Sequence, residues 1–524
     1  MTEDSRTLVI GTSHVHPREV ALVALDPLFH VELNHDALTL IGRSREVVER
    51  AAASGQRVYG LNTLLGSGRD TVVEEKAVLA YQVQVVRYHN SGVGEYLDRS
   101  SARAVILARL VGFSRGGSGV RPETARFYAE LLNRGVFPAI PREGSVGSSD
   151  LTQLAAVAAV AIGEGTAIDA AGTLVPGAKA LADAGLQPLT LAPGEALALV
   201  SANAYSVGSG TLALVRLQQV AGLADVALSL SLETIARYDG GGNLSPFSAA
   251  IQAAKAVDGQ RKSAAAVRRL LSGGWLEDVR PEVSVQDALS FRAAPQTHGA
   301  FRSLVSQLGL ALEVELNGRG DNPLADVESG LMVSGGNFQP MQLALFFEGL
   351  RLALAHVGIS SERRIAKLYP PQRAIRAKHL QAAADGPGGE GGLVEEELPG
   401  LLWYSAAGLL AELKFLAAPA TLGAPTLSAD VEDHSSLAPL ALQQLEKSLD
   451  AAEKLLAIEA LTASFLLLEA GAAKPLGKGT AAVVGRLADL LADRPSAPQL
   501  VERARSELRE LVDSVESQEG EKAW

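Results

Sequence analysis

Hydrophobic positions recur with helical spacing over most of the chain. From about residue 73 onward, apolar side chains return every three or four positions, which predicts helices separated by Gly- and Pro-rich breaks. Several stretches exceed the ~12 residues of an average globular helix and are apolar around much of their surface. Such helices need cover on all sides, so the pattern predicts a helical bundle. The predicted helices span residues 38–54, 100–111, 122–133, 151–162, 196–235, 296–316, 340–365, 401–418, 437–469 and 481–516.

The first part of the chain carries a mixed pattern. Short β-prone runs at residues 8–10 and 29–33 stand between turns, ahead of the first helical stretch. The sequence therefore predicts a mainly α protein with a mixed N-terminal region. We expect three consecutive parts: an N-terminal active-site domain at 1–205, a central helical bundle at 206–475 and a C-terminal helical region at 476–524.

Composition and charge exclude several classes of function. The formal charge of −12 disfavours nucleic acid or an anionic membrane as a partner. The chain has no cysteine, which excludes disulfides, thiolate metal sites and a cysteine nucleophile. The longest apolar stretch, 206–234, is interrupted by Arg216 and Asp225 and is typical of a buried helix rather than a membrane span. The N-terminus carries no apolar signal core, so we expect a cytoplasmic location.

Tyr59 lies in a turn with the sequence Val58-Tyr59-Gly60-Leu61-Asn62-Thr63. A rigid turn of this kind holds a tyrosine near a surface or cleft. There the tyrosine acts as a general base if its neighbours lower its pKa from about 10. An ordinary turn tyrosine fits the same pattern.

Two hydroxyl residues precede the predicted helix at 151–162. Ser148 and Ser149 stand directly ahead of Asp150. We expect Ser149 or Asp150 to cap the helix by accepting its free backbone N–H groups. The same helix end is a suitable place for an anion or for developing negative charge.

Two further loops carry charged candidates. Arg292 suits bidentate binding of a carboxylate, although a surface or structural ion pair is the commoner role for an arginine in a polar loop. Glu432, Asp433 and His434 are consecutive, so they do not share one face, and no partner cluster has ligand spacing. We therefore expect no metal site, and a cap or a single general acid or base at this position.

Each motif is weak alone, but their order along the chain resembles the histidine and phenylalanine ammonia-lyases. These belong to the aromatic amino acid ammonia-lyase and aminomutase family. The resemblance runs from about residue 58 to 468 and is strongest to the bacterial histidine ammonia-lyases. The matching motifs are Tyr59-Gly60-x-Asn62-Thr63, His89-x-x-Gly92-Val93-Gly94, Gly144-Ser145-Val146-Gly147, Val285-Gln286-Asp287, Ser290-x-Arg292, Pro295-Gln296, Asp321-Asn322-Pro323, Gly335-Gly336-Asn337-Phe338, Ser361-Glu362-Arg363-Arg364 and Glu432-Asp433-His434.

The resemblance implies the long central helix bundle of these enzymes, a small-molecule substrate, and a homotetramer whose active sites combine loops from three subunits. It also implies an electrophilic methylidene-imidazolone, which family members build from an internal Ala-Ser-Gly. In that cyclisation the glycine nitrogen attacks the alanine carbonyl. A third residue without a side chain eases the tight ring closure.

This chain departs from the family at the prosthetic group. Gly147 is followed by Ser148-Ser149-Asp150, which lacks the glycine of Ala-Ser-Gly. Ser201 stands where the family usually has an asparagine that contacts the group, and Leu289 stands where it usually has a tyrosine. We therefore predict that the methylidene-imidazolone does not form, and we expect no other cofactor.

The substrate-handling groups match the family better. The resemblance implies that Tyr59 is the base, Arg292 the carboxylate clamp and His89 a side-chain selectivity residue. Tyr88 and Gln339 replace a serine and a histidine of histidine-type members, which argues against histidine as the substrate. The predicted catalytic residues are Tyr59, Ser148, Ser149 and Glu432, and the predicted substrate-binding residues are Tyr88, His89, Ser201, Asn203, Gln286, Leu289, Arg292, Phe338 and Gln339.

The sequence favours an ammonia-lyase-like enzyme that acts on an amino acid or an amino-acid-derived carboxylate. Proton abstraction by Tyr59 would lead to elimination, isomerisation or cyclisation while Arg292 holds the carboxylate. Ser148 and Ser149 would stabilise anionic charge, and Glu432 would relay a proton or bind an amine. Two alternatives stay open. One is a conventional histidine-type ammonia-lyase or aminomutase with an unusual ring built from the two serines and the aspartate. The other is a non-catalytic binding protein on the same scaffold.

Overall fold

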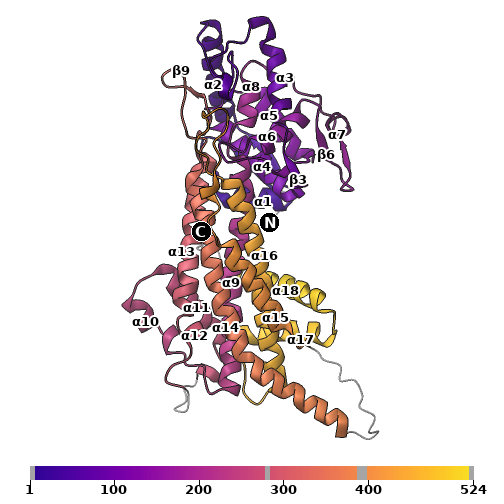
Figure 1. Ribbon diagram of the computed structural model, residues 1–524, viewed down its shortest axis with the longest axis vertical. Helices are drawn as coiled ribbons and strands as arrows, with labels where there is room; N and C mark the ends of the chain where they lie inside the picture. Colours follow the sequence, from indigo (N-terminus) through magenta and orange to yellow (C-terminus); the bar gives the residue numbers. More distant parts are fainter. Residues whose placement is uncertain (1–5, 278–283, 386–397, 519–524) are drawn as a thin grey trace. The chain divides into compact units, whose positions relative to one another are not determined.

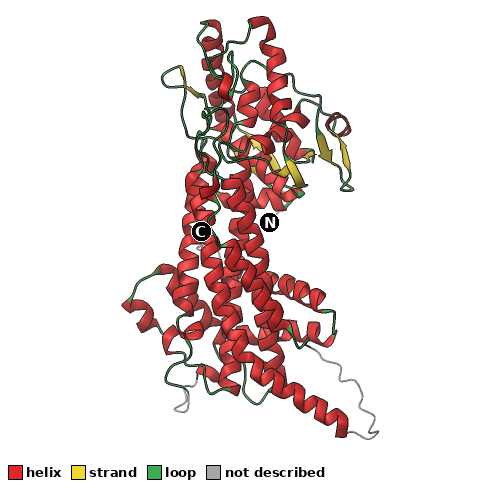
Figure 2. Cartoon of the chain, viewed as in Figure 1, coloured by secondary structure: helices red, strands yellow, loops and turns green. Residues whose placement is uncertain are grey.

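The computed structural model describes residues 6–277, 284–385 and 398–518 (Figure 1). Helices dominate these residues and the strands are short, as predicted for a mainly α protein (Figure 2). The chain forms two compact units. Unit 1 comprises the described residues of Met1–Val215, Gln307–Glu348 and Pro419–Gln443, and unit 2 those of Arg216–Ser306, Gly349–Ala418 and Gln444–Trp524. The predicted division at residues 205 and 475 stays a prediction, because these units group stretches by contacts in space.

Every strand of the described residues belongs to unit 1, together with the shorter helices of the chain's first part. Its complete elements are β1 (Thr7–Ile10), α1 (Pro17–Leu25), β2 (His30–Leu33), α2 (His35–Ala53), η2 (Gly66–Gly68), η3 (Glu75–Ala77), α3 (Val78–His89), β3 (Val93–Tyr96), α4 (Arg99–Ser114), α5 (Pro122–Asn133), β4 (Phe137–Pro138), β5 (Pro141–Glu143), α6 (Leu151–Ala161), β6 (Thr166–Ile168), β7 (Leu174–Pro176), α7 (Gly177–Asp183), α8 (Glu195–Val200), β8 (Leu324–Asp326), β9 (Leu331–Val333) and η6 (Thr421–Gly423).

The predicted mixed N-terminal region is confirmed by β1 and β2, which pair in parallel from Thr7 opposite His30 to Ile10 opposite Leu33. Buried and exposed positions alternate along β1, as expected for a strand with one face in the core. The other strands of unit 1 form two antiparallel pairs, β3 with β5 and β8 with β9, and one three-stranded antiparallel sheet in the order β4-β6-β7.

Three helices of unit 1, α3, α6 and α8, pack against one another. The sequence of α6 is apolar around its whole circumference, and every residue after Leu151 is buried. A helix with this composition is stable only when neighbours cover all of its faces. The N-terminus of α6 meets the C-terminus of α8, where Ser149 Oγ lies 3.1 Å from Ser201 Oγ, and Arg87 near the C-terminus of α3 pairs with Glu164 just after α6.

The loop that precedes α6 contradicts the predicted cap, because its Asp150 side chain contacts the next long helix, α9 (Ala204–Tyr238). Asp150 occupies the N-cap position of α6, and its backbone carbonyl accepts from Leu154 N at 3.1 Å, but its side chain accepts no hydrogen bond from that helix. Ser145 Oγ accepts one instead, from Thr152 N at 3.1 Å. The Asp150 carboxylate turns to α9 and accepts from Ser206 N at 2.7 Å and Ser206 Oγ at 3.0 Å. The predicted cap is wrong because the start of α9 competes for the same carboxylate.

Burial is the main influence on the Asp150 carboxyl. The side chain has no exposed surface, and desolvation raises its pKa to about 7. Hydrogen bonds from Ser206 and the backbone of Tyr205 oppose this rise, and the nearby Glu315 carboxylate adds to it. The protein therefore holds a proton on Asp150 more tightly when folded than when unfolded.

Arg109 on α4 connects two loops of unit 1. Its guanidinium donates to the Ala198 carbonyl and to Asp321 Oδ1, the latter at 2.7 Å, and it stacks on the Phe113 ring at 4.4 Å. Arg109 and Asp321 are both almost fully buried, so their charges are retained as a pair. The end of α8 is thereby tied to the Asp321-Asn322-Pro323 turn.

Unit 2 contains the larger parts of four long helices. Its elements are most of α9, η4 (Ser245–Phe247), α10 (Ala249–Ala254), α11 (Asp258–Leu271), η5 (Trp275–Glu277), α12 (Leu289–Arg292), the first half of α13 (Ala294–Asn317), most of α14 (Met341–Asp385), α15 (Leu402–Leu416), most of α16 (Ala438–Glu469), α17 (Lys478–Ala492) and α18 (Ala497–Gln518).

Three predicted helix extents are wrong. The helix expected at 481–516 is two helices, α17 and α18, which are separated where Arg494 adopts a φ of 48° just before Pro495. The helix expected at 340–365 continues to Asp385 through Pro370 and Pro371, because buried side chains on either side of the prolines keep it packed. The helix expected at 196–235 is broken into α8 and α9. The break is stabilised from outside the helix, since Ala202 O accepts the backbone N–H of Asp150 at 2.8 Å.

Two apolar helical stretches, Glu195–Tyr238 and Met341–Ala382, are long enough to cross a membrane by length and composition alone. Within the protein, 67% and 50% of their most apolar windows are buried. Burial of this extent fits the interpretation of residues 206–234 as a core helix.

A fully buried ion pair organises the core of unit 2. Glu459 on α16 accepts from Arg364 Nε at 2.5 Å and Nη2 at 2.8 Å, and from Ser231 and Ser361 hydroxyls at 2.6 Å each. Neither charged side chain has exposed surface. The remaining arm of Arg364 donates to the carbonyl of Ser290 at 3.0 Å, which anchors α12.

Replacing Arg364 by methionine removes one half of this pair and leaves Glu459 charged and buried. Breaking a buried pair in this way costs about 3–5 kcal/mol, so the unfolding free energy should fall by that order. Urea unfolding of Arg364→Met measures the loss. The matched control is Arg363→Met, whose side chain is 65% exposed, with an expected change within about 0.5 kcal/mol. Equal losses of unfolding free energy in the two variants would contradict the conclusion that the Arg364–Glu459 pair stabilises the core of unit 2.

The raised pKa of Asp150 predicts a pH dependence of stability. Because the folded state binds this proton more tightly, the contribution of Asp150 to stability is greatest below about pH 4 and is lost as pH rises to about 7, with a slope of at most about 1.4 kcal/mol per pH unit. Asp150→Asn keeps an oxygen for Ser206 N and removes the titration, so the fall should be shallower. Unfolding measured across this pH range tests it, with Asp183→Asn on the surface of α7 as the control. Parallel curves for wild type and Asp150→Asn would rule the effect out.

Candidate active site

Tyr59 is held by a buried turn after α2. Its neighbours Val58 and Leu61 belong to a small hydrophobic cluster with Val47 and Val48 of α2, which fixes the turn against the core of unit 1. The Tyr59 ring is partly buried, and its oxygen accepts the backbone N–H of Gly66 at 2.9 Å. The predicted base therefore has a defined position and a hydrogen-bond donor directed at its oxygen.

Gly60 is required for this turn. Its φ of 69° lies in the left-handed region, and a Cβ at this position would come within 2.4 Å of a Leu197 methyl carbon. The absence of a side chain lets the turn approach α8 closely. Glycine next to Tyr59 thus serves the placement of the base.

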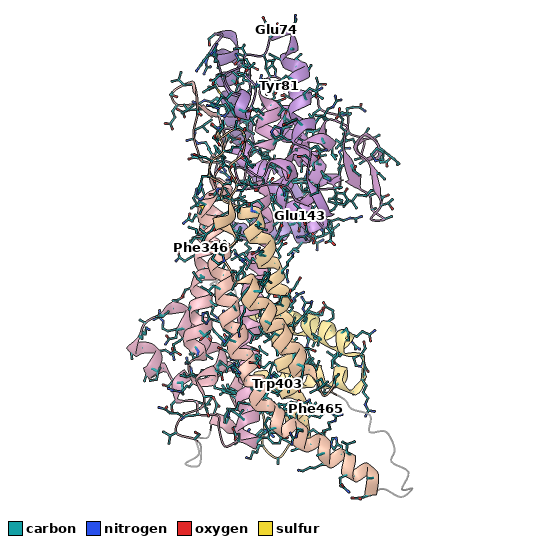
Figure 3. All side chains as sticks on the ribbon, viewed as in Figure 1. Glu74, Tyr81, Glu143, Phe346, Trp403 and Phe465 are labelled. Atoms are coloured by element: carbon teal, nitrogen blue, oxygen red, sulfur yellow. The ribbon has the colours of Figure 1, made fainter. Side chains whose placement is uncertain are left out.

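Electrostatics around Tyr59 show which groups lie close to it. Burial raises the pKa of its phenol, Glu432 raises it further, and the Gly66 N–H and Arg69 lower it. Tyr81 on α3, labelled in Figure 3, is a second phenol beside it, with a pKa raised to about 12 by burial and by Tyr59. The structure thus brings two predicted residues, Tyr59 and Glu432, into one neighbourhood and adds Tyr81.

Glu432 is carried by a tight turn that starts at Leu427. The two residues pair through both of their backbone hydrogen bonds, at 2.9 and 3.2 Å. Between them Ser428, Ala429 and Asp430 all have positive φ, at 53°, 50° and 63°. Non-glycine residues rarely adopt this conformation, and each one costs of order 1 kcal/mol or more, so the surrounding contacts must hold the turn in place.

One such contact reaches the Tyr59 loop. Ser428 Oγ accepts the backbone N–H of Ser67 at 2.9 Å, next to the Gly66 N–H that donates to Tyr59. The loop that positions the base and the loop that carries Glu432 are therefore joined directly.

Ser148 and Ser149 are buried and their hydroxyls face different partners. Ser148 Oγ lies 3.1 Å from Ser435 Oγ, and Ser149 Oγ lies 3.1 Å from Ser201 Oγ. The backbone N–H of Ser149 donates to the Phe338 carbonyl at 3.3 Å. Four predicted residues, Ser148, Ser149, Ser201 and Phe338, thus meet at the start of α6.

The start of α16 supports the same loop. Ser436 Oγ donates to the Gly147 carbonyl at 2.8 Å, and the Leu437 N–H donates to the Val146 carbonyl at 2.8 Å. Gly147 has a φ of 82°, and a Cβ here would collide with Ser436. The loop that precedes the two serines is thereby fixed on both sides.

A cavity joins Tyr59 to the serine cluster. It encloses about 350 Å³, opens to solvent, and has both Tyr59 and Ser201 in its wall. Asp321, which is paired with Arg109, also contributes to the wall. The other lining residues are Val48, Leu61, Ser118, Gly194, Leu197, Ala198, Asn322, Pro323 and Met332.

Gln339 and Asn203 each present an unpaired oxygen. Gln339 Nε2 donates to the His434 carbonyl at 3.0 Å, while its Oε1 is buried without a hydrogen-bond partner among the described residues. Asn203 is buried at the start of α9, and its Oδ1 is likewise without a partner in the described part of the chain.

Tyr88 and His89 end α3. His89 Nδ1 lies 2.7 Å from the Val85 carbonyl, and the two rings meet edge to face at 5.7 Å. Tyr88 is 84% exposed, so in the single chain it faces solvent. Their predicted role in substrate selectivity stays a prediction.

Gln286, Leu289 and Arg292 belong to unit 2, unlike the other predicted site residues. Gln286 and Leu289 are exposed, and Arg292 is partly buried with its Nε lacking a hydrogen-bond partner among residues 6–277, 284–385 and 398–518. Asp287 anchors the segment by accepting from the Gly242 and Asn243 N–H groups. An arginine held on a fixed helix with free donor capacity suits a carboxylate.

Three contributors to the site escaped the sequence analysis. Gly66 follows Tyr59 in the same loop, and Tyr81 precedes His89 on the same helix, so both lie close to the matching motifs but outside them. Ser428 is 361 residues from its partner Ser67, and no local pattern signals that contact. In the described residues no group of three or more His, Asp and Glu side chains is arranged to hold a metal ion.

The sequence profile of the aromatic amino acid lyase family matches residues 15–489. The histidine ammonia-lyase of Caldanaerobacter subterraneus subsp. tengcongensis is 34% identical over 476 residues, which cover 91% of this chain and 90% of that protein. Among solved structures, the ergothioneine degrading enzyme ergothionase from Treponema denticola matches with a TM-score of 0.85 and 27% identity, covering 97% of this chain and 99% of that one. The histidine ammonia-lyase from Trypanosoma cruzi matches with a TM-score of 0.80 and 26% identity, covering 97% and 95%.

These similarities confirm the predicted family and the predicted helical fold of the histidine and phenylalanine ammonia-lyases. They extend beyond the motif-bearing segments to nearly the whole chain. Members of this family act on small molecules. The protein therefore belongs to the aromatic amino acid lyase family, a family of carbon–nitrogen lyases.

Proposed function

We propose that the protein is a lyase that works without a methylidene-imidazolone, on an amino-acid-derived carboxylate whose leaving group or C–H bond is already activated. The observation that carries this proposal is that both the backbone N–H and the side chain of Asp150 are engaged in hydrogen bonds. In Ser148-Ser149-Asp150 the nitrogen of Asp150 would have to attack the carbonyl of Ser148.

The surroundings of Asp150 do not suit this ring. Its N–H is engaged by the Ala202 carbonyl at 2.8 Å, and its fully buried carboxylate holds Ser206 at the start of α9. Ring closure would have to move a nitrogen whose side chain is fixed elsewhere. The shifted register 147–149 would use Ser149 N, which donates to the Phe338 carbonyl and carries a side chain of its own. Neither register offers the bare, mobile nitrogen that glycine provides.

The absence of the electrophile limits the substrate. A free amino group is a poor leaving group, and general-base catalysis by Tyr59 supplies only ~10²–10⁴-fold. A substrate with a more acidic C–H bond or a better amine leaving group removes this difficulty. A structural relative is described as degrading ergothioneine and was solved with desmethyl-ergothioneine sulfonic acid, which supports substrates other than simple aromatic amino acids in this fold.

In the proposed elimination the Tyr59 phenolate takes the β-proton and the C–H electrons form the new double bond. The C–N bond breaks, and its electron pair leaves with the amine. The Gly66 N–H favours the phenolate form of Tyr59, and Glu432 stands close enough to bind the departing amine or its proton. Ser148 and Ser149 donate to developing negative charge at the start of α6.

Arg292 would hold the carboxylate of the substrate. Its Nε lacks a partner in the described residues, and Arg364 fixes α12 through Ser290. We further propose that the site is completed in a homotetramer, where α12 of one subunit serves the Tyr59 loop of another. Exposure of Leu289 and Val285 beside Arg292 supports such a contact.

The rival function is that of a conventional histidine ammonia-lyase, favoured by the identity of the curated relatives. It requires a ring derived from residues 148–150. Isomerisation or cyclisation by the same base is compatible with the proposed site and differs only in the fate of the carbanion-like intermediate.

The intact mass decides between these functions. We expect the purified chain to have its unmodified mass, because Asp150 prevents cyclisation. A mass lower by two water molecules would overturn the proposal and support the rival. A matched variant with Ser148→Ala and a glycine inserted after Ser149 restores Ala-Ser-Gly, and loss of water from this variant alone would show that the scaffold still permits the ring.

Replacing Tyr59 by phenylalanine should lower the elimination rate by about 10²–10⁴-fold with little change in substrate binding, because it removes the base but not the carboxylate clamp. Since the pKa of Tyr59 is raised, the wild-type rate should climb with pH through the alkaline range, and the variant should lose that climb. Steady-state kinetics across pH measure both, on the carboxylate that accumulates in a deletion strain. Tyr238→Phe, whose hydroxyl donates to the Leu466 carbonyl in unit 2, is the control. Full activity of Tyr59→Phe would remove Tyr59 from the mechanism.

A further inference from the structure

A second cavity lies at the start of α9. Its empty volume is about 400 Å³, open solvent at the mouth included, and its polar walls are formed by Arg109, Asn203, Glu315 and Asp321. Asp321 also lines the cavity that contains Tyr59, so the two cavities share a wall. The remaining lining residues are Ala108, Gly112, Ala202, Ala204, Val207, Leu316, Gly318 and Gly320.

Asn203 supplies an acceptor without a donor. The residue is only 7% exposed, and its Oδ1 is buried with no hydrogen-bond partner in the described structure. Its Nδ2 donates to Glu315 Oε2 at 3.4 Å, which fixes the orientation of the amide and leaves the carbonyl oxygen for another group. A buried acceptor without a donor costs about 1–3 kcal/mol, so a ligand or water that donates to it is favoured.

Glu315 supplies a charge without a counter-ion. Burial raises the pKa of its carboxyl, and the hydrogen bond from Asn203 is the one influence that opposes the rise. No ion pair joins Glu315 to a cation in the described part of the chain. The buried carboxyl of Asp150 lies close enough for Glu315 to raise its pKa further, so negative charge accumulates here.

Arg109 is the one cationic side chain in the cavity wall, and it is already paired with Asp321. Arg109 donates to Asp321 Oδ1 at 2.7 Å and to the Ala198 carbonyl, and it stacks on Phe113. The charges of Arg109 and Asp321 offset each other. Glu315 is left without a counter-ion among the described residues, and a largely desolvated carboxyl group is stabilised either by a proton or by a cation.

We propose that this cavity, which we call the Asn203–Glu315 cavity, binds a small ammonium cation. Ammonium has several N–H donors and no acceptor, which matches a wall that offers a carbonyl oxygen and a carboxylate. A water molecule could satisfy Asn203 but would not neutralise Glu315. The natural ligand is the protonated amine that leaves the substrate, and this identification rests on the proposed function. The shared wall at Asp321 puts the cavity beside the site where that amine is released.

Ammonium itself is the probe. Thermal unfolding of the wild-type protein is compared in ammonium chloride and in potassium chloride at equal concentration. Potassium has the same charge and a similar radius but cannot donate hydrogen bonds. At about ten times the dissociation constant, ammonium should raise the Tm by about 1 °C or more over potassium. An equal rise with both salts, or no rise at any ammonium concentration, overturns the proposal.

Variants locate the binding. Glu315→Gln keeps the shape of the side chain and removes its charge, and we expect it to abolish the difference between the two salts. Glu313→Gln makes the same change two residues earlier on α13, in a side chain that lies 3.2 Å from His16 Nδ1, and should keep the difference. Persistence of the ammonium response in Glu315→Gln would overturn the assignment of the cavity. If that variant does not fold, broadening of the ¹⁵N-ammonium signal by wild-type protein decides, and loss of the broadening in excess potassium chloride overturns the proposal.

The unfolding assay needs no substrate and no turnover, so its failure is separate from failure of the proposed function. Tyr59→Phe should keep the ammonium response, because Tyr59 does not line this cavity. Ammonium binding combined with a fully active Tyr59→Phe would reject the proposed mechanism and keep the cation site. A Tyr59-dependent elimination without ammonium binding would do the reverse.

Discussion

The arrangement of the site depends on the buried carboxylate of Asp150. Its backbone N–H donates to Ala202 and its side chain accepts from Ser206, so one residue ties the start of α6 to the start of α9. This double attachment sets Ser149 beside Ser201. A carboxylate without exposed surface is tolerable here because the first N–H groups of α9 are directed at it.

The same contact underlies the proposal that the chain keeps the family's scaffold without forming a methylidene-imidazolone. Asp150 remains the anchor between two helices, and the shortened loop ahead of it has no glycine nitrogen free to cyclise. The base and its supports lie elsewhere. Tyr59 depends on Gly60, Gly66 and the hydrophobic cluster of α2.

Polar groups without partners mark the places where the single chain is chemically incomplete. Most buried polar atoms in folded proteins have hydrogen-bond partners. Arg292 Nε, Asn203 Oδ1 and Gln339 Oε1 have none in the described residues. In unit 2 the arginine donor suits a carboxylate, and in unit 1 the two amide oxygens suit an amine or a hydroxyl.

The sequence by itself determined the helical bundle, the mixed N-terminal region and the family, because hydrophobic periodicity and short motifs are local properties. It also located Tyr59, Ser148, Ser149 and Glu432 as candidates, since each stands in a Gly- or Ser-rich loop next to a helix. Tertiary structure alone decided that Asp150 caps α9 rather than α6.

Tertiary structure also decided that a single predicted helix breaks at Ser201. It brings Ser428 to Ser67, which is 361 residues away along the chain. Tertiary structure likewise brings Asn203 and Glu315 to one cavity. Hydrogen bonds and charge pairs between distant segments depend on distances of a few ångströms in space, and no local pattern in the sequence encodes those distances.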